Sequence, residues 1–404
     1  MRIGLIISQP FRESIGTDVR IRGLSEGMAK LGVEVVILSP FDRKEEKLCD
    51  NIILKPLKEK SNNLVSLKAI YGIGKKIINS KRLKELPIPQ IYYMERIAKS
   101  LAKDIEKKVE ALNLDAVQAE QEIAALSCVY TPNKLSVPIL FDIHGIWPEE
   151  LVASGLLKPD SSRYKKILKI EKRIVNNVDA VLVVSEEMKK YVVDKYKASS
   201  DFVHVIPNAA FPRRNERPYN PEAFKVVYAG TLTFRENMPL LLDSFQFVAK
   251  KCSKAHFYLS SKGEALDFVK SYARKIEATL TFTWLDDFYH FYNFLMTCHV
   301  GTIPALKHTW RQMATPAKLY DYLSAGVPVV SVDIGSSWNE IISKNKVGIL
   351  TENNPEAFAS AILTFLKNPE LVYEYGNRAI QLVKNELNYE KSAEQLKKLY
   401  EKLA

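Results

Sequence analysis

TPAKLYDYLSAGVPVV, residues 315–330, predicts a short helix followed by a buried strand. Thr315 can cap this helix, and the proline after it suits the first helical position. The unpaired N–H groups and positive dipole end of such a helix attract anions, and Lys318 lies in the first turn. Asp321 follows three residues later, close to the same face. A cation beside a carboxylate suits a ligand with phosphates at one end and a sugar diol at the other.

The alternative interpretation is a plain helix–strand joint with Lys318 and Asp321 in water, because charged helix residues are usually solvated. Gly326 ends the helix in both interpretations. The apolar run that follows is typical of a buried parallel strand, with Pro328 near its start, where a missing N–H is tolerated. The stretch therefore predicts an α/β domain, whatever its function.

Length and composition indicate a globular chain with two domains. The 404 residues can bury two separate cores, and 47% hydrophobic with 26% charged residues is ordinary for a soluble protein. The four cysteines are scattered without a Cys-x-x-Cys pair, which argues against a zinc site or a disulfide framework. The first apolar run is too short for a signal peptide, and no run reaches the length of a membrane span. We expect a cytoplasmic protein.

The net charge of +11 points to anionic partners. Nucleic acid is not the expected partner, because the sequence has no zinc-finger spacing, no aromatic RNA-binding signature and no arginine cluster. The chain opens with a strand, a loop containing Gly16 and a helix over about 17–31. This loop lacks the GxGxxG fingerprint, which argues against an NAD enzyme.

A second informative stretch is VPILFDIHGIWPEE, residues 137–150. Its apolar run predicts a buried strand, and Asp142 and His144 lie on one face as that strand ends. A carboxylate beside an imidazole can fix its tautomer, although a lone histidine at a strand end is more often structural. The acidic run 120–122 is interpreted either as acids in the first turn of a helix or as part of an acceptor pocket.

The order of these motifs along nearly the whole chain resembles the GT-B glycosyltransferases, particularly the retaining family 4. Asp321 falls on the acidic position that precedes the family's small-residue, Gly-x-Pro-Val-Val run and holds the nucleotide ribose. Pro316-Ala317-Lys318 matches a Pro-x-Lys found in a subset of related enzymes. Met313 stands where the family often has a glutamate that faces the donor sugar.

The resemblance also implies roles for residues elsewhere. His144 would contact the donor sugar beside the reaction centre, and Gly16 would let backbone approach the donor phosphate. The family's diphosphate-binding Arg and Lys positions read Thr231 and Glu236 here, so Arg235 is the available clamp. The resemblance thus assigns catalysis to His144, Arg235 and Lys318. It assigns substrate binding to Gly16, Asp142, Leu285 in the base loop, Arg311, Thr315 and Asp321.

The expected fold is α/β, with two doubly wound parallel-sheet domains facing each other across a cleft. Residues 1–208 would bind the acceptor, with 388–404 crossing back onto them, and 209–387 would bind the nucleotide sugar. The expected reaction is sugar transfer with retention and without a cofactor. No Asp-x-Asp motif for a metal is present, so Arg235, Lys318 and the helix dipole would stabilise the leaving diphosphate. The rival interpretations are a sugar-nucleotide epimerase of the same fold and a non-catalytic nucleotide-binding relative.

Residues 55–100 predict a membrane-facing surface. Nine basic residues stand against one acid between Lys55 and Lys84, and apolar residues recur there at three- and four-residue spacing. Such a helix would bind the cytoplasmic face of an anionic membrane and would favour a lipid-linked or surface glycan as acceptor. The alternative is an amphipathic helix packed on its own domain with a solvated lysine face.

Overall fold

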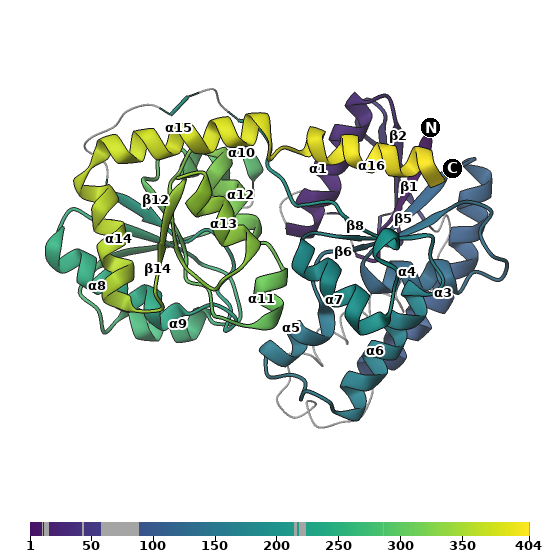
Figure 1. Cartoon of the computed structure of the whole chain (residues 1–404), viewed down its shortest axis with the longest axis horizontal. Coiled ribbons are helices and arrows are strands. Elements are labelled where there is room, and N and C mark those ends of the chain that lie inside the picture. Colours follow the sequence, from purple (N-terminus) through teal and green to yellow (C-terminus); the bar gives the residue numbers. More distant parts are fainter. Residues whose placement is uncertain are drawn as a thin grey trace. The chain divides into compact units, whose positions relative to one another are not determined.

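The computed structural model describes residues 1–9, 11, 16–42, 44–57, 89–213, 216–217, 224–285 and 287–403. The chain divides into two compact units, the first Met1–Pro207 with Glu390–Ala404 and the second Asn208–Tyr389 (Figure 1). The membrane prediction falls largely on residues 58–88, which lie outside the described residues. No helix in the described ranges is both long enough and apolar enough to cross a bilayer.

The first unit is built on an eight-stranded sheet of order β3-β4-β2-β1-β5-β6-β7-β8. All its neighbouring strands are parallel except β3 and β4, which pair antiparallel at one edge. Its central strands are buried along their whole length, as expected for strands covered on both faces. The strands are β1 Arg2–Ile6, β2 Glu34–Ser39, β3 Glu46–Cys49, β4 Ile52–Pro56, β5 Ala116–Glu120, β6 Ile139–Ile143, β7 Ala180–Val183 and β8 Val203–Val205.

Helices join these strands in doubly wound order. Ser161 and Ser185 cap the helices that follow them by accepting hydrogen bonds from the N–H groups of Tyr164 and Met188. The helices are α1 Gly16–Lys30, α3 Pro89–Ala111, α4 Gln121–Val129, α5 Trp147–Ala153, α6 Ser162–Val175, α7 Glu186–Tyr196 and α16 Tyr389–Leu403. The last helix, α16, lies with the first unit, and Lys397 Nζ donates to the carbonyl of Leu31 (Figure 1).

The second unit is built on a six-stranded parallel sheet of order β11-β10-β9-β12-β13-β14. Its strands are β9 Lys225–Val227, β10 His256–Ser260, β11 Thr279–Thr283, β12 Val300–Ile303, β13 Val329–Val332 and β14 Gly348–Thr351. Its helices are α8 Met238–Lys251, α9 Leu266–Ala273, α10 Phe288–Leu295, α11 Thr309–Met313, α12 Ala317–Ser324, α13 Ser337–Lys344, α14 Pro355–Lys367 and α15 Pro369–Asn385. Two parallel α/β units confirm the predicted fold class.

The structure corrects the start of the helix in the opening stretch. Thr315 was predicted as its N-cap, but the cap is Pro316 and helix α12 begins at Ala317 without a side-chain capping bond. The reason is steric, because a residue that precedes proline is driven towards extended backbone. Gly326 ends the helix as predicted, with a φ of 67° that favours glycine.

Candidate functional site

Polar side chains meet where β5 and β6 end in the first unit. The two strands are parallel neighbours, and their register places Glu120 opposite Asp142. Gln118 precedes Glu120 by two residues, and His144 follows Asp142 by two, so strand alternation brings all four side chains to one face. We call Glu120, Asp142 and His144 the His144 cluster.

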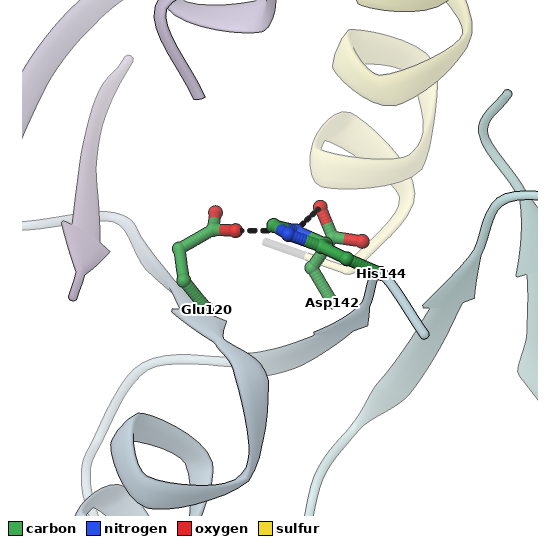
Figure 2. A group of neighbouring side chains, drawn as sticks. All are labelled: Glu120, Asp142 and His144. Atoms are coloured by element: carbon green, nitrogen blue, oxygen red, sulfur yellow. Dashed lines mark ion pairs between the residues drawn. The ribbon is translucent and has the colours of Figure 1, made fainter. Parts of the chain in front are cut away.

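The imidazole of His144 lies between the two carboxylates (Figure 2). Its Nε2 is 2.8 Å from Oε2 of Glu120 and 3.4 Å from Oδ2 of Asp142. The side chains of His144, Glu120 and Asp142 are 9%, 2% and 0% exposed. Within the described part of the chain, the buried Nδ1 of His144 has no hydrogen-bond partner. That nitrogen is therefore left for a group outside the chain.

Three further side chains fix the two carboxylates. Arg20 in α1 donates to both oxygens of Asp142 at 3.1 Å. The Gln118 amide donates to Oε1 of Glu120 at 2.7 Å and to Oδ2 of Asp142 at 3.0 Å. Tyr400 in α16 donates to the Gln118 carbonyl oxygen at 2.5 Å, which sets the orientation of the amide. Helix α16 thus completes the cluster.

Charges in the cluster favour a protonated imidazole. Burial alone would lower the pKa of His144, but Asp142 and then Glu120 raise it to about 9. Burial likewise opposes charge on Asp142, yet Arg20 and His144 lower the pKa of that carboxyl to about 2. Burial and the charge of Asp142 raise the pKa of Glu120. The cluster is therefore an imidazolium held by two acids.

The same three residues could in principle hold a cation, because their ligand atoms lie within 4.8 Å of one another. A metal ligand must be a neutral imidazole, whereas the carboxylates here stabilise the charged form. Both oxygens of Asp142 are also engaged by Arg20. The donor set fits an ion-pair network better than a metal centre.

The predicted Asp142–His144 pair is confirmed, but sequence reasoning missed Glu120 as its partner. The acidic run 120–122 looked like the first turn of a helix, whereas Glu120 is the last residue of β5 and only Gln121 begins α4. Gln118, Arg20 and Tyr400 carried no local signal. Gly16 is the first residue of α1, the helix that carries Arg20 one turn later.

A second polar cluster lies around the start of α12 in the second unit. Lys318 pairs with Glu236, from the loop before α8, at 2.6 Å. Oε1 of Glu236 also accepts from Arg311 in α11 at 2.7 Å. Arg235 and Arg311 both lie over the ring of Trp310, at 5.4 Å. We call Arg235, Glu236, Arg311 and Lys318 the Glu236 cluster.

Most of this cluster is buried, with Arg235 half-buried, and its loop is closely packed. The side chains of Glu236, Arg311 and Lys318 are 6%, 7% and 10% exposed. Gly230 has a φ of 154°, and a Cβ there would lie 3.0 Å from Cε of Lys318. Burial lowers the pKa of Lys318, while Glu236 opposes that shift. Burial would raise the pKa of Glu236, but Arg311 and Lys318 hold it below its ordinary value.

Asp321 lies one turn further along α12. Its Oδ1 accepts a hydrogen bond from the Tyr292 hydroxyl at 3.0 Å. Burial raises the pKa of Asp321 to about 6, while the hydrogen bond from Tyr292 and the nearby charge of Lys318 oppose this shift. Thr315 is half-buried in the turn before α12, and Leu285 is half-buried between β11 and α10. The structure therefore gathers Arg235, Arg311 and Lys318 in one cluster.

Two family models match the two units in turn. The model described as Glycosyltransferase Family 4 matches residues 15–212, and the model described as Glycosyl transferases group 1 matches residues 223–368. Among curated proteins, a probable glycosyltransferase, WbjE of Pseudomonas aeruginosa, is 24% identical over 233 residues. That match covers 54% of this chain and 58% of the relative, so the chain spans a little over half the length of the curated relative it matches.

Solved structures match over the whole length. Sucrose-phosphate synthase from Thermosynechococcus elongatus superposes with a TM-score of 0.72 at 16% identity, covering 100% of this chain and 98% of that one. TarM of S. aureus, solved with fondaparinux, alpha-GlcNAc-glycerol and UDP, superposes with a TM-score of 0.67 at 13% identity, covering 99% of both chains. At these identities the likeness establishes the fold.

Proposed function

Because this chain is a glycosyltransferase of the GT-B fold, we propose that it moves a sugar from a nucleoside-diphosphate sugar to an acceptor hydroxyl, with retention and without a metal. The observation that carries the proposal is the buried Glu236 cluster at the start of α12, with the carboxylate of Asp321 one turn later. This spacing suits a donor with a diphosphate and a ribose diol.

The cluster and the helix supply the charge that the reaction needs. Arg235, Arg311 and Lys318 lie around one anionic position, and the positive end of the α12 dipole adds to their field. When the sugar leaves, negative charge develops on the diphosphate, and fixed cations stabilise that charge without reorganising. They take the place that a divalent cation fills in other phosphate chemistry. Activity that survives EDTA supports this step.

Asp321 is proposed to accept the ribose hydroxyls. Its Oδ1 already accepts from Tyr292, and a carboxylate has further lone pairs for a diol. Burial raises the pKa of this carboxyl to about 6. Hydrogen bonds donated by the ribose hydroxyls would favour its charged form. The ribose hydroxyls of the donor would therefore give Asp321 further hydrogen-bond partners beside Tyr292.

His144 is proposed to contact the donor sugar during transfer. In its imidazolium form the unpartnered Nδ1–H is a donor for a sugar hydroxyl, while Glu120 and Asp142 hold the other ring nitrogen. The new bond joins the acceptor oxygen to the anomeric carbon on the face that the diphosphate leaves. The anomeric C–O bond breaks with its electron pair on the phosphate oxygen, which takes the acceptor proton.

The experiment that tests the donor assignment is a screen of UDP-, GDP- and ADP-sugars by thermal shift, followed by release of nucleoside diphosphate with a glycan acceptor. A ligand present at 100 times its dissociation constant adds about 2.7 kcal/mol of stability. An epimerase of this fold would convert the donor without an acceptor. A non-catalytic relative would bind the donor and release nothing.

The acceptor is proposed to be a lipid-linked or surface glycan, reached at the cytoplasmic face of the membrane. The support is a basic face on α6, where Lys165, Lys166, Lys169 and Lys172 are exposed and the helix's one acid, Glu171, is buried. These cations recur along one side of the helix, which suits a flat anionic surface.

The neighbouring helix α3 extends this basic face. Tyr130, at the end of α4, accepts a hydrogen bond from Arg173 of α6 at 2.8 Å, and Nζ of Lys99 of α3 lies 5.4 Å from its ring centroid. Lys103 and Lys107 of α3 are also exposed. Cations of two helices thus meet at one tyrosine, which makes the face broader than a single helix.

A further inference from the structure

A carboxylate holds together the cations of the Glu236 cluster. Oε1 of Glu236 accepts from Arg311 at 2.7 Å and from Lys318 at 2.6 Å, and each of these side chains is nine-tenths buried. Two buried cations around one point repel each other unless an anion lies between them. In this structure that anion is part of the chain.

Polar atoms around this carboxylate lack partners. Within the described part of the chain, Oε2 of Glu236, Nε of Arg311 and Nε1 of Trp310 are buried without a hydrogen bond. Each unpartnered buried atom costs free energy, so native proteins contain few of them. Two of the three atoms are donors, which indicates a place prepared for a further anionic or oxygen-rich group.

The backbone beneath Glu236 is held by hydrogen bonds that do not involve its side chain. The N–H of Glu236 donates to Thr233 O at 3.3 Å, and residue 236 forms an isolated bridge with Ala305. The next N–H, of Asn237, donates to Pro304 O at 2.9 Å. The carboxylate can therefore turn away by side-chain rotation without loss of these main-chain bonds.

We propose that Glu236 is an internal counter-anion, which offsets part of the positive charge of Arg311 and Lys318 in the empty site and gives them up to the diphosphate of the donor. This inference rests on the proposed donor site. With Glu236 in place, three positive charges against one negative charge leave two in excess, and when Glu236 turns away the three cations face the two negative charges of the diphosphate in a nucleotide sugar. Arg311 and Lys318 are thereby kept in position between turnovers.

The test compares the full-length chain with Glu236→Gln and with Glu340→Gln as control. Glu340 is also paired with a lysine, Lys344, but both are exposed. Melting temperatures are measured without phosphate and with pyrophosphate, UDP, GDP or ADP, and dissociation constants by calorimetry. Glu236→Gln is expected to melt at a lower temperature without anions and to recover with pyrophosphate, whereas Glu340→Gln behaves like the wild type.

Pyrophosphate and the cognate nucleoside diphosphate are expected to bind Glu236→Gln about tenfold more tightly than the wild type, since close charge pairs couple by more than the ~1.4 kcal/mol that tenfold represents. Equal or weaker binding overturns the counter-anion. If Glu236→Gln binds pyrophosphate more tightly while neither chain binds a nucleoside diphosphate, the counter-anion stands and the donor assignment fails. If neither chain binds pyrophosphate, both ideas fail.

A double variant is studied together with Glu236→Gln, in case the single variant does not accumulate as a folded protein. The double variant distinguishes an effect of charge from an effect on folding. Glu236→Gln with Lys318→Gln removes one charge of each sign, so the excess of two is unchanged. We expect its melting temperature to return towards that of the wild type and the tighter pyrophosphate binding to be lost. Tighter binding that persists in the double variant would mean that shape, not charge, is responsible.

Discussion

The Tyr400 hydroxyl donates a 2.5 Å hydrogen bond to the Gln118 carbonyl oxygen, which connects α16 to the strand that carries Glu120. Because this bond fixes which end of the amide faces the acids, the Gln118 NH2 group contacts both Glu120 and Asp142. A residue near the end of the chain therefore positions the carboxylates around His144.

Removal of this hydroxyl should alter the His144 cluster without touching the substrate. Tyr400→Phe leaves the buried Gln118 oxygen unpaired, so unfolding should become easier by about 1–3 kcal/mol. The amide can then turn over, and the alkaline limb of the pH–rate profile should shift as the carboxylates lose their donor. Loss of stability with an unchanged pH profile would show that Tyr400 only supports the fold.

His144→Ala should slow transfer strongly while leaving nucleotide binding intact. The base, ribose and diphosphate are assigned to the second unit, so the dissociation constant for nucleoside diphosphate should stay within about twofold. Loss of a donor to developing charge typically lowers kcat by ~100- to 1,000-fold. Transfer assays measure the loss of activity, and calorimetry on the same preparation measures nucleotide binding. Full activity in the variant would show that His144 is a structural residue.

The raised pKa of His144 predicts how stability depends on pH. Its pKa rises from 6.5 to about 9 on folding, so the charged imidazole contributes fully below pH 6.5, and the contribution is lost as pH rises through 9. The difference in unfolding free energy between wild type and His144→Gln should be about 3 kcal/mol larger at acidic pH than above pH ~10. Urea titrations at several pH values measure it. A difference that does not change with pH would contradict the imidazolium.

The Asp321→Asn variant should be more stable than the wild type and should bind nucleotide more weakly. Burial raises the pKa of Asp321 from 3.8 to about 6, so its charged form costs free energy at neutral pH, and the neutral amide should stabilise the ligand-free chain by up to about 3 kcal/mol. The same change weakens hydroxyl hydrogen bonds worth ~1.5–3 kcal/mol each. A higher melting temperature with weaker nucleotide binding is the expected pair of results. Unchanged nucleotide affinity would sink the ribose assignment.

The basic face predicts membrane binding that salt weakens. Replacing Lys165, Lys169 and Lys172 with Glu should weaken binding to anionic vesicles by at least a factor on the order of 100, because each lysine contributes about 1 kcal/mol near such a surface. Sedimentation with anionic and neutral liposomes measures it. The control carries three exposed lysines of the second unit changed to Glu, namely Lys251, Lys367 and Lys384. If both triple variants bind equally well, this face is not the docking surface.

The sequence predicted most strands and helices because buried parallel strands appear as uninterrupted apolar runs such as Ile139–Ile143. Asp142 and His144 could be paired because two residues on one strand share a face by local geometry. Glu120 could not be paired with them, since its contact depends on the register between β5 and β6, which the packing of the whole sheet decides.

The same limit applies in the second unit. Lys318 and Asp321 lie on one helix turn, and local spacing predicted that both face one ligand. The partner of Lys318 within the chain is Glu236, 82 residues earlier, and Gly230 of the same loop lies close to the lysine, a contact that local spacing does not predict. Glu236 stands where the family resemblance implied a basic residue. Only the structure shows that its carboxylate lies between Arg311 and Lys318.

The place of α16 has a consequence for biosynthesis. The ribosome makes residues 208–389 before it makes the helix that bears Tyr400, so the second unit can fold while the first still lacks its final element. Gln118 gains its partner only when Tyr400 has left the exit tunnel. A messenger truncated ahead of the codon for Tyr400 would yield a chain with an intact second unit and an unfinished His144 cluster, so each molecule becomes competent only once α16 has been made.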